Sequence, residues 1–175
     1  MTTKPSPKDV LAAIKQEDLA GLDRLFRQDP QLPKLQTPFG SWLHVAAEYS
    51  KPAVAKYLVE HGLDIEQKSG VAGGTAINIA ASEGCSEIVA YLLERGATLD
   101  VSAPERNPLF SAIYGGHAEL VAILLDAGID ATVRYTGPSM KNMDAAAFAR
   151  ERGQAELARL VEAHIDGERN AAQKG

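Results

Sequence analysis

The sequence contains a single cysteine, Cys85, in 175 residues, so the chain cannot form an internal disulfide bond. It has no run of 18 apolar residues, and the opening segment Met-Thr-Thr-Lys-Pro-Ser-Pro-Lys-Asp contains no apolar signal core. Nothing therefore indicates an oxidising compartment or a membrane-bound location. We expect a soluble cytoplasmic protein that has no membrane partner.

An excess of positive charge is also absent. The chain carries 18 lysines and arginines against 23 aspartates and glutamates, which gives a formal net charge of −5. Because binding to nucleic-acid phosphates needs a basic surface, this balance argues against a nucleic-acid partner. The same negative charge would suit a basic protein partner.

The residue patterns of common active sites are missing as well. No Gly-x-Ser-x-Gly segment marks a serine nucleophile, and the glycine-rich residues 69–74 lack the Gly-Lys-Ser/Thr ending of a phosphate-binding loop. The four histidines form no i, i+4 pair, and no His/Cys/Asp cluster has zinc spacing. Cys85 would need a lowered pKa and a histidine partner to act as a nucleophile, so a structural role is favoured over a reactive thiol. We therefore predict no enzyme, no metal and no cofactor.

What the sequence does contain is an internal repeat. Residues 75–97 predict two short helices, with small residues on the first and apolar residues at helical spacing on the second. Gly84 separates the two helices, and Gly96 ends the second one. Related segments begin at Ser41 and Asn107, so successive segments start 34 and 32 residues apart (41 to 75 and 75 to 107).

This period and its internal pattern resemble the ankyrin repeat, a turn and two antiparallel helices around a Thr-Pro-Leu-His-x-Ala-Ala signature. The signature is matched in pieces by His44-Val-Ala-Ala47, by Thr75 with Ala80-Ala81, and by Pro108-Leu109. The resemblance implies an all-α solenoid of about five helix-turn-helix units, with loops or short hairpins projecting from it. It also implies structural histidines: His44 would bond the neighbouring turn, and His117 would open a second helix.

We predict one domain over residues 6–165, with flexible termini at 1–5 and 166–175. The units are expected at about residues 6–36, 37–70, 71–102, 103–137 and 138–165. The 37 residues from Asn107 to Asp144 exceed the period by about four, which predicts a longer loop near Tyr135–Lys141. Because stacked repeats bury one continuous core, we expect a monomer before a partner binds.

The surface left for a partner consists of the projecting loops and the exposed end of each first helix, which are the positions that ankyrin proteins usually use. By register these positions are Phe39, Trp42, Glu48, Tyr49, Ser82, Glu83, Glu105, Arg106, Tyr114, Tyr135, Lys141, Met143, Glu151 and Arg152, with Val71 and Met140 beside them in the loops. Trp42 is the strongest candidate, because it replaces the proline of the signature and because tryptophan is frequent at binding hot spots. The alternative is that Trp42 packs over the neighbouring loop, and that Tyr49 and Tyr114 are merely exposed.

Longer strings extend the resemblance over three of the five units. The segments Gly40–Ala47, Asn107–Ile113 and Lys141–Gly153 are similar to short stand-alone bacterial ankyrin proteins, some of which are immunity proteins for secreted toxins. This similarity implies a non-enzymatic protein that binds and inhibits one protein partner, such as a basic toxin or enzyme. The alternative is a scaffold or adaptor that joins partners without inhibiting them.

Overall fold

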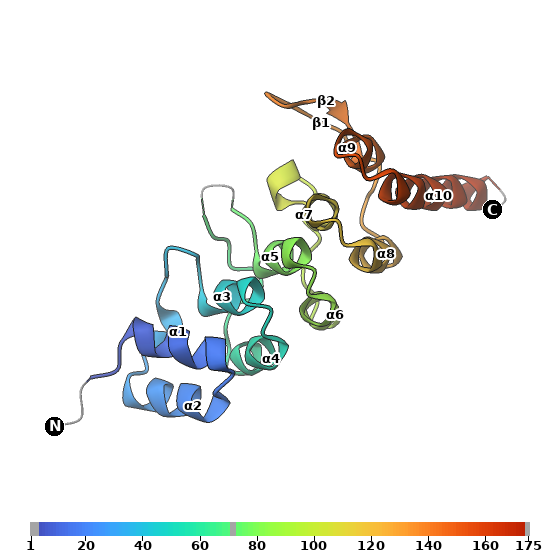
Figure 1. The fold of residues 1–175 in the computed structure, drawn as a ribbon. Helices are drawn as coiled ribbons and strands as arrows, with labels where there is room; N and C mark the ends of the chain where they lie inside the picture. Colours follow the sequence, from blue (N-terminus) through green and yellow to red (C-terminus); the bar gives the residue numbers. More distant parts are fainter. Residues whose placement is uncertain (1–3, 71–72, 174–175) are drawn as a thin grey trace.

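The computed structural model describes residues 4–70 and 73–173 as an array of antiparallel helix pairs (Figure 1). The helices are α1 (Pro7–Gln16), α2 (Leu19–Gln28), α3 (Trp42–Glu48), α4 (Pro52–Glu60), α5 (Ala76–Glu83), α6 (Ser86–Glu94), α7 (Pro108–Gly115), α8 (Ala118–Asp126), α9 (Ala145–Glu151) and α10 (Ala155–Ala172). Two short 3-10 helices, η1 (Leu32–Lys34) and η2 (Pro104–Arg106), lie in the connections. The strands β1 (Tyr135–Gly137) and β2 (Met140–Met143) form an antiparallel hairpin in which Tyr135 is opposite Met143.

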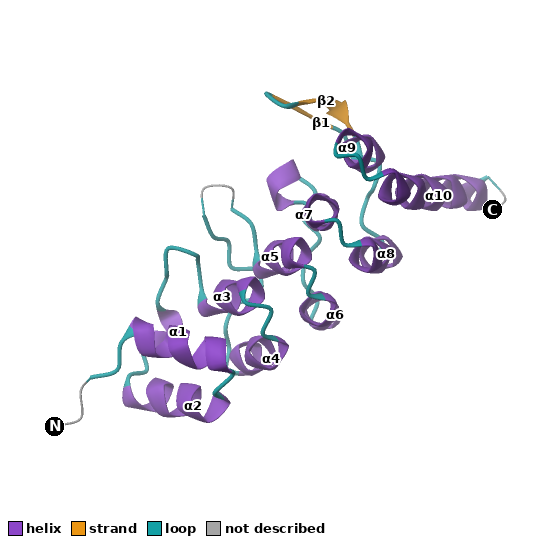
Figure 2. Ribbon diagram, viewed as in Figure 1, coloured by secondary structure: helices purple, strands orange, loops and turns teal. Residues whose placement is uncertain are grey.

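The helices form two rows, as Figure 2 shows. The first helices of successive pairs, α3, α5, α7 and α9, pack against one another in an inner row, and α4, α6, α8 and α10 form an outer row. Loops project beside the inner row; they include a tight turn closed by Thr37 and Gly40, a wider loop closed by Ser69 and Gly74, and the β1–β2 hairpin. The expected all-α solenoid with projecting loops and a short hairpin is confirmed.

Repetition of small and large side chains builds the core. The inner helices bury alanines at equivalent positions, such as Ala46 in α3, Ala80 in α5 and Ala112 in α7, so neighbouring helices can approach closely. The outer helices bury a ladder of leucines, Leu58, Leu92 and Leu124, none of which has accessible surface. Each helix pair thus buries its apolar side chains both between its own two helices and against the next pair.

Polar side chains fix the register between units. The Nε2–H group of His44 donates to the carbonyl oxygen of Gly74 at 3.4 Å, while its Nδ1 accepts a hydrogen bond from the Ser41 hydroxyl at 2.8 Å. Asn78, at the equivalent position of α5, donates from Nδ2 to the carbonyl oxygen of Arg106 at 2.6 Å. The bond predicted from His44 to the neighbouring turn is confirmed. His117 is the N-cap residue of α8, as expected, and its Nε2–H donates to the Ser82 carbonyl oxygen at 2.9 Å.

The next interface uses an aromatic cluster instead. Phe110 occupies in α7 the position that His44 and Asn78 hold in α3 and α5. Its ring packs edge-on against Tyr135, with ring centroids 5.0 Å apart, and stacks on Phe148 of α9 at 4.8 Å. Asn107, three residues before Phe110, provides the hydrogen bond across this interface: its Nδ2 donates to the Tyr135 hydroxyl oxygen at 3.0 Å. This interface therefore combines a hydrogen bond between side chains with packed aromatic rings.

Trp42 corrects a prediction made from the sequence. The side chain is only 2% exposed, and its Nε1–H donates to the carbonyl oxygen of Leu32 in η1 at 2.7 Å. The first residue of α3 thus points back onto the preceding connection, where the indole fills the space between the first two units. The prediction that Trp42 offers a surface to a partner is wrong; the side chain is buried, as the alternative supposed, but its hydrogen bond is to η1 rather than to a projecting loop.

Residues 166–172 also differ from the flexible tail that we expected, because α10 continues through them to Ala172 (Figure 1). Ile165 is the last buried side chain of this helix, and the residues after it are exposed. Alanine, glutamate and arginine have high helix propensity, and Arg169 lies 3.7 Å from Asp166 one turn earlier. The segment therefore forms a helix without being packed.

Replacing Trp42 with alanine is expected to lower the free energy of unfolding by about 3–5 kcal/mol, because it removes a large buried side chain and leaves a cavity. Urea denaturation followed by circular dichroism measures this change. Trp42→Phe is the matched variant; it keeps most of the apolar contact but loses the bond to Leu32, and it should cost about 1–2 kcal/mol. A loss below about 0.5 kcal/mol in Trp42→Ala would contradict the burial.

Stability should depend on pH through His44. Burial lowers the pKa of His44, against a smaller opposing effect of the Gly74 carbonyl. The unfolded chain takes up the proton near pH 6.5, whereas the folded chain does so only at lower pH, so the free energy of unfolding falls as pH drops below about 6.5. Chemical denaturation at pH 7.5 and pH 5.0 measures this loss. His44→Asn copies the residue at the equivalent position of α5 and should lose less stability over this interval; an equal loss would assign the effect to other groups.

Candidate protein-binding groove

The inner row and the projecting loops enclose one continuous groove. It consists of two adjoining hollows of about 640 Å³ and 480 Å³, which share Ser82, Glu105 and Ser111 in their walls. We call the larger hollow the apolar end and the smaller one the acidic end. The apolar end lies over α7, α9 and the hairpin, and the acidic end lies over α3, α5 and the first two loops.

Repeat register places the residues of the groove floor. Glu48, Ser82 and Tyr114 each come seven residues after the N-cap residue of their inner helix. Because the helices of the inner row stack with a common orientation, these three side chains lie in adjacent units and line the same groove. The floor is therefore a direct product of the sequence period.

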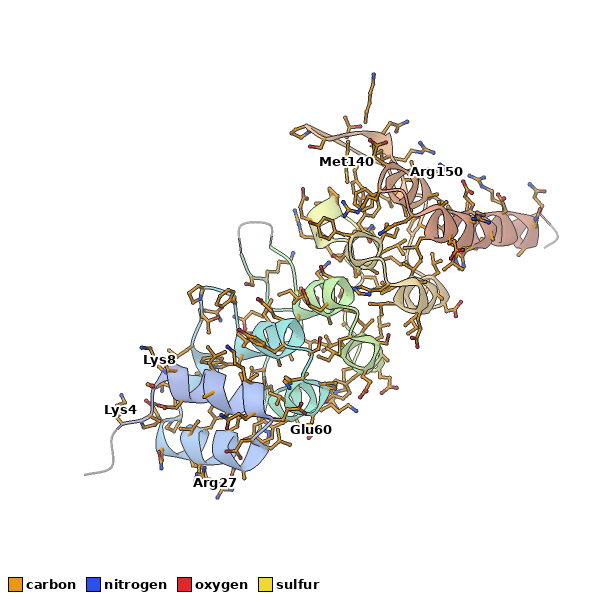
Figure 3. All side chains as sticks on the ribbon, in the orientation of Figure 1. Lys4, Lys8, Arg27, Glu60, Met140 and Arg150 are labelled. Atoms are coloured by element: carbon orange, nitrogen blue, oxygen red, sulfur yellow. The ribbon has the colours of Figure 1, made fainter. Side chains whose placement is uncertain are left out.

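Aromatic rings dominate the apolar end. Phe110, Phe148 and Tyr114 line it from the helices, and Met140 lines it from the hairpin, where Figure 3 places this residue next to the inner row. Tyr114 is 61% exposed, and the guanidinium of Arg152 lies 4.2 Å from the centroid of its ring. Glu105 is the one charged residue in the lining of this end within the described parts of the chain. This end can accept an apolar group.

Tyr135 forms a wall of the apolar end rather than the exposed loop contact that we expected. Its side chain is only 8% exposed; the hydroxyl donates to the Val101 carbonyl oxygen at 2.7 Å and accepts from Asn107. Burial raises the pKa of Tyr135, so the hydroxyl stays protonated at neutral pH. Both bonding directions of the hydroxyl are used within the protein, and the ring serves as an apolar surface.

Carboxylates define the other end. Glu48 and Glu83 line the acidic end from α3 and α5, Glu105 lies between the two ends, and all three side chains are exposed. In the part of the chain that the structure describes, none of the three forms an ion pair, and the lining of the groove contains no lysine or arginine. Three uncompensated carboxylates along one concave surface produce a negative potential there.

The cations near the groove are engaged elsewhere. The Arg106 guanidinium lies 3.8 Å from Asp100, whose pKa is held below its ordinary value mainly by hydrogen bonds from Ser102. The ammonium of Lys15 lies over the ring of Tyr49, 4.6 Å from its centroid. Lys68, next to Ser69 in the wall of the acidic end, also lies 3.8 Å from Asp100. In the described residues, these ion pairs and ring contacts leave Glu48, Glu83 and Glu105 without an ion pair of their own.

The structure brings together about half of the residues predicted from the sequence. Those that line the groove are Phe39, Glu48, Ser82, Glu83, Glu105, Tyr114 and Tyr135. Tyr49, Lys141, Glu151 and Arg152 are exposed outside its lining, and Arg106 and Met143 are half-buried outside it. Trp42 is buried, and Val71 lies outside the described residues.

Sequence reasoning missed the apolar lining of the groove. Phe110 and Phe148 sit inside helical patterns and are not among the residues predicted to contact a partner, and Pro104 and Ser111 carry no signal of their own. A signal for Phe110 did exist, because it replaces the polar residue found at the same register in the two preceding units. A phenylalanine in place of a polar residue indicates that this interface between units is held by apolar packing rather than by a hydrogen bond from that position.

No metal site accompanies this groove. Across residues 4–70 and 73–173, no group of three or more His, Cys, Asp or Glu side chains is arranged to hold a metal ion. The helices described in those ranges also include none with the length and apolar character needed to span a membrane. What the groove offers is an apolar hollow next to a row of carboxylates, which suits a binding surface.

Comparison with known proteins yields several relatives. The chain is 32% identical over 127 residues to protein phosphatase 1 regulatory subunit 27 of Homo sapiens, covering 71% of this chain and 82% of that protein. It is 32% identical over 104 residues to the B-cell lymphoma 3 protein homolog of Mus musculus, covering 55% of this chain and 23% of that protein. It is also 32% identical over 123 residues to palmitoyltransferase Hip14 of Drosophila melanogaster, covering 69% of this chain and 19% of that protein. The chain thus matches less than a quarter of the length of the latter two.

A family model of ankyrin repeats in three copies matches residues 10–103 and also residues 43–135. The two matches overlap and together run from residue 10 to residue 135, which is more than half of the chain. This agrees with the repeat period, the paired helices and the projecting loops described above. The chain belongs to the ankyrin repeat family.

Proposed function

We propose that this protein binds one basic protein partner in its groove and inhibits that partner by covering its functional surface. Membership of the ankyrin repeat family makes the chain a protein–protein interaction module, and the family is generally non-catalytic. The identity of the partner and the inhibition are the parts proposed here. The observation that carries the proposal is the row of unpaired carboxylates beside an apolar hollow on one concave surface.

Charge complementarity supports a basic partner. Glu48, Glu83 and Glu105 would attract and orient a positively charged surface, which raises the association rate as well as fixing the register of the complex. The exposed aromatic side chains Phe39 and Tyr114 supply anchors of the kind that dominate binding energies. Nanomolar inhibition requires about −12 kcal/mol of binding free energy, which a few such anchors together with the charged row can provide.

A single continuous groove favours one partner over several. Both hollows lie on the same side of the inner row and share three lining residues, so one ligand could occupy both. Three sequence segments resemble short stand-alone bacterial ankyrin proteins, some of which are toxin immunity proteins, and this resemblance motivates a toxin as that partner. A relative whose name makes it a regulatory subunit of a protein phosphatase supports, more broadly, a protein that regulates another protein by binding it.

The second candidate function is an adaptor. One observation favours it: the end of α10, from Asp166 to Ala172, is helical and exposed away from the groove (Figure 1). This surface could engage a second protein while the groove holds the first. An adaptor would leave the activity of the protein bound in the groove unchanged, which separates it from an inhibitor.

Affinity capture with the purified protein as bait, followed by an activity assay of the captured protein, tests the proposal. We expect one stoichiometric basic protein, and its activity should fall in proportion to added protein up to a 1:1 ratio. Tyr114→Ala should weaken the complex by about 2 kcal/mol, or about 30-fold in Kd, because it removes an exposed aromatic anchor from the apolar end of the groove.

Tyr49→Ala is the matched control for this variant. Both tyrosines lie at the end of an inner helix beneath a cation, but only Tyr114 lines the groove, so Tyr49→Ala should change Kd less than threefold. Equal losses of affinity in the two variants would show that the groove is not the binding surface. Capture of a protein whose activity is unaffected at saturation would replace the inhibitor with the adaptor.

A further inference from the structure

We propose that the groove recognises a short linear segment of its partner, in which one bulky apolar side chain fills the apolar end and neighbouring lysines or arginines lie along Glu105, Glu83 and Glu48. This inference rests on the proposed function and deepens it, since it specifies which part of the partner binds in the groove. It follows from the chemistry of the two ends and from their order along the stack.

The apolar end determines the anchor. Its volume of about 640 Å³ is typical of sites that enclose a small ligand or a large side chain with its neighbours. Phe110 and Phe148 present stacked rings, and Tyr114 and Met140 add to the apolar part of the lining, which also contains serine and threonine side chains. The Tyr135 hydroxyl is already bonded twice, so it offers nothing to a polar ligand group. An aromatic or branched aliphatic side chain satisfies this end.

The acidic end determines the flanking charges. Glu105 lines both hollows, so it faces the residue next to the anchor; Glu83 on α5 follows, and Glu48 on α3 lies furthest from the anchor. Successive inner helices carry these last two carboxylates, so the row runs along the stack rather than across it. A chain lying in the groove would present its cations in one direction from the anchor, toward the N-terminal units.

The shape of the groove favours a segment over a flat surface. Loops rise along one side of the floor, from the Thr37–Gly40 turn, through the loop closed by Ser69 and Gly74 and through η2, to the β1–β2 hairpin. Residues of all four lie in the lining together with residues of the inner helices. An extended chain can reach the floor between loops and helices, whereas a broad convex surface would contact only the loop tips.

The charge row can be tested without knowing the partner. A phage-displayed library of random dodecapeptides is selected on the immobilised wild-type protein, and the enriched sequence is synthesised with a fluorescein label for anisotropy titrations. We expect enrichment of one bulky apolar residue with lysines or arginines on one side of it. The triple variant Glu48→Gln, Glu83→Gln, Glu105→Gln should weaken binding of this peptide about tenfold, since each exposed ion pair contributes a factor of about 1.5 to 5.

The matched control is the triple variant Glu60→Gln, Glu94→Gln, Glu119→Gln. It changes the net charge by the same three units, but its residues are exposed on the outer helices α4, α6 and α8, and Glu60 lies on the outer row in Figure 3. This control should change the Kd of the peptide less than twofold. Raising NaCl from 50 to 300 mM should weaken binding to the wild type and to the control more than binding to the groove variant.

The position of the anchor is tested with a double-mutant cycle. Tyr114→Ala should weaken the enriched peptide about tenfold or more, yet should have no further effect on a peptide whose apolar residue is replaced by alanine. Glu48→Gln should weaken both peptides equally, because it contacts a different part of the segment. Tyr114 is largely exposed, so its replacement leaves the core intact; circular dichroism spectra of the variants verify this.

Three outcomes would overturn the inference. An enriched sequence without cations, or equal losses in the two triple variants, would remove the charge pairing while leaving the groove as a binding site. Failure to enrich any peptide, with a whole protein still captured in a Tyr114-dependent manner, would show that the partner is recognised as a folded surface, and the proposed function would stand. Failure of that capture as well would reject the proposed function itself.

Discussion

The close approach of neighbouring inner helices is the contact on which the rest of this structure depends. Alanines at equivalent positions, among them Ala46, Ala80 and Ala112, allow the helices to lie side by side, and leucines of the outer row fill the space behind them. No helix pair could bury its apolar face alone, so the geometry of each unit is set by its neighbours. The floor of the groove inherits its regular spacing from this contact.

The two ends of the groove differ because one position in the repeat changes character. His44 and Asn78 reach across to the backbone of the next unit and leave a polar surface in front of them. Phe110 cannot make such a bond; its ring stacks on Phe148 and packs edge-on against Tyr135. Phenylalanine at this position of the repeat thus replaces a hydrogen bond between units with an apolar hollow. The hydrogen bond between Asn107 and Tyr135 of the hairpin links the units instead.

Periodicity made the fold and the groove floor predictable from the sequence. Glu48, Ser82 and Tyr114 could be placed because they recur at one position of the repeat. Trp42 could not, because its burial depends on η1, a short helix ten residues earlier that has no repeat counterpart to reveal it. The pairing of Phe110 with Phe148 depends on how α7 meets α9, which side-chain packing decides. The polar end of α10 fits an exposed helix and a disordered tail equally well by composition.

The two tyrosines covered by cations give the inner row a further property. Lys15 over Tyr49 and Arg152 over Tyr114 lie at opposite ends of the row that contains Glu48 and Glu83. Along the inner row the sign of the charge therefore runs plus, minus, minus, plus, and Glu105 adds a third negative charge beside the row, so that a negative centre is flanked by a cation at each end. A uniformly basic surface would gain attraction at the centre and meet repulsion at both edges. The inner row thus selects for the length of a ligand's positive stretch as well as for its sign, and it disfavours long polycations that net charge alone would favour.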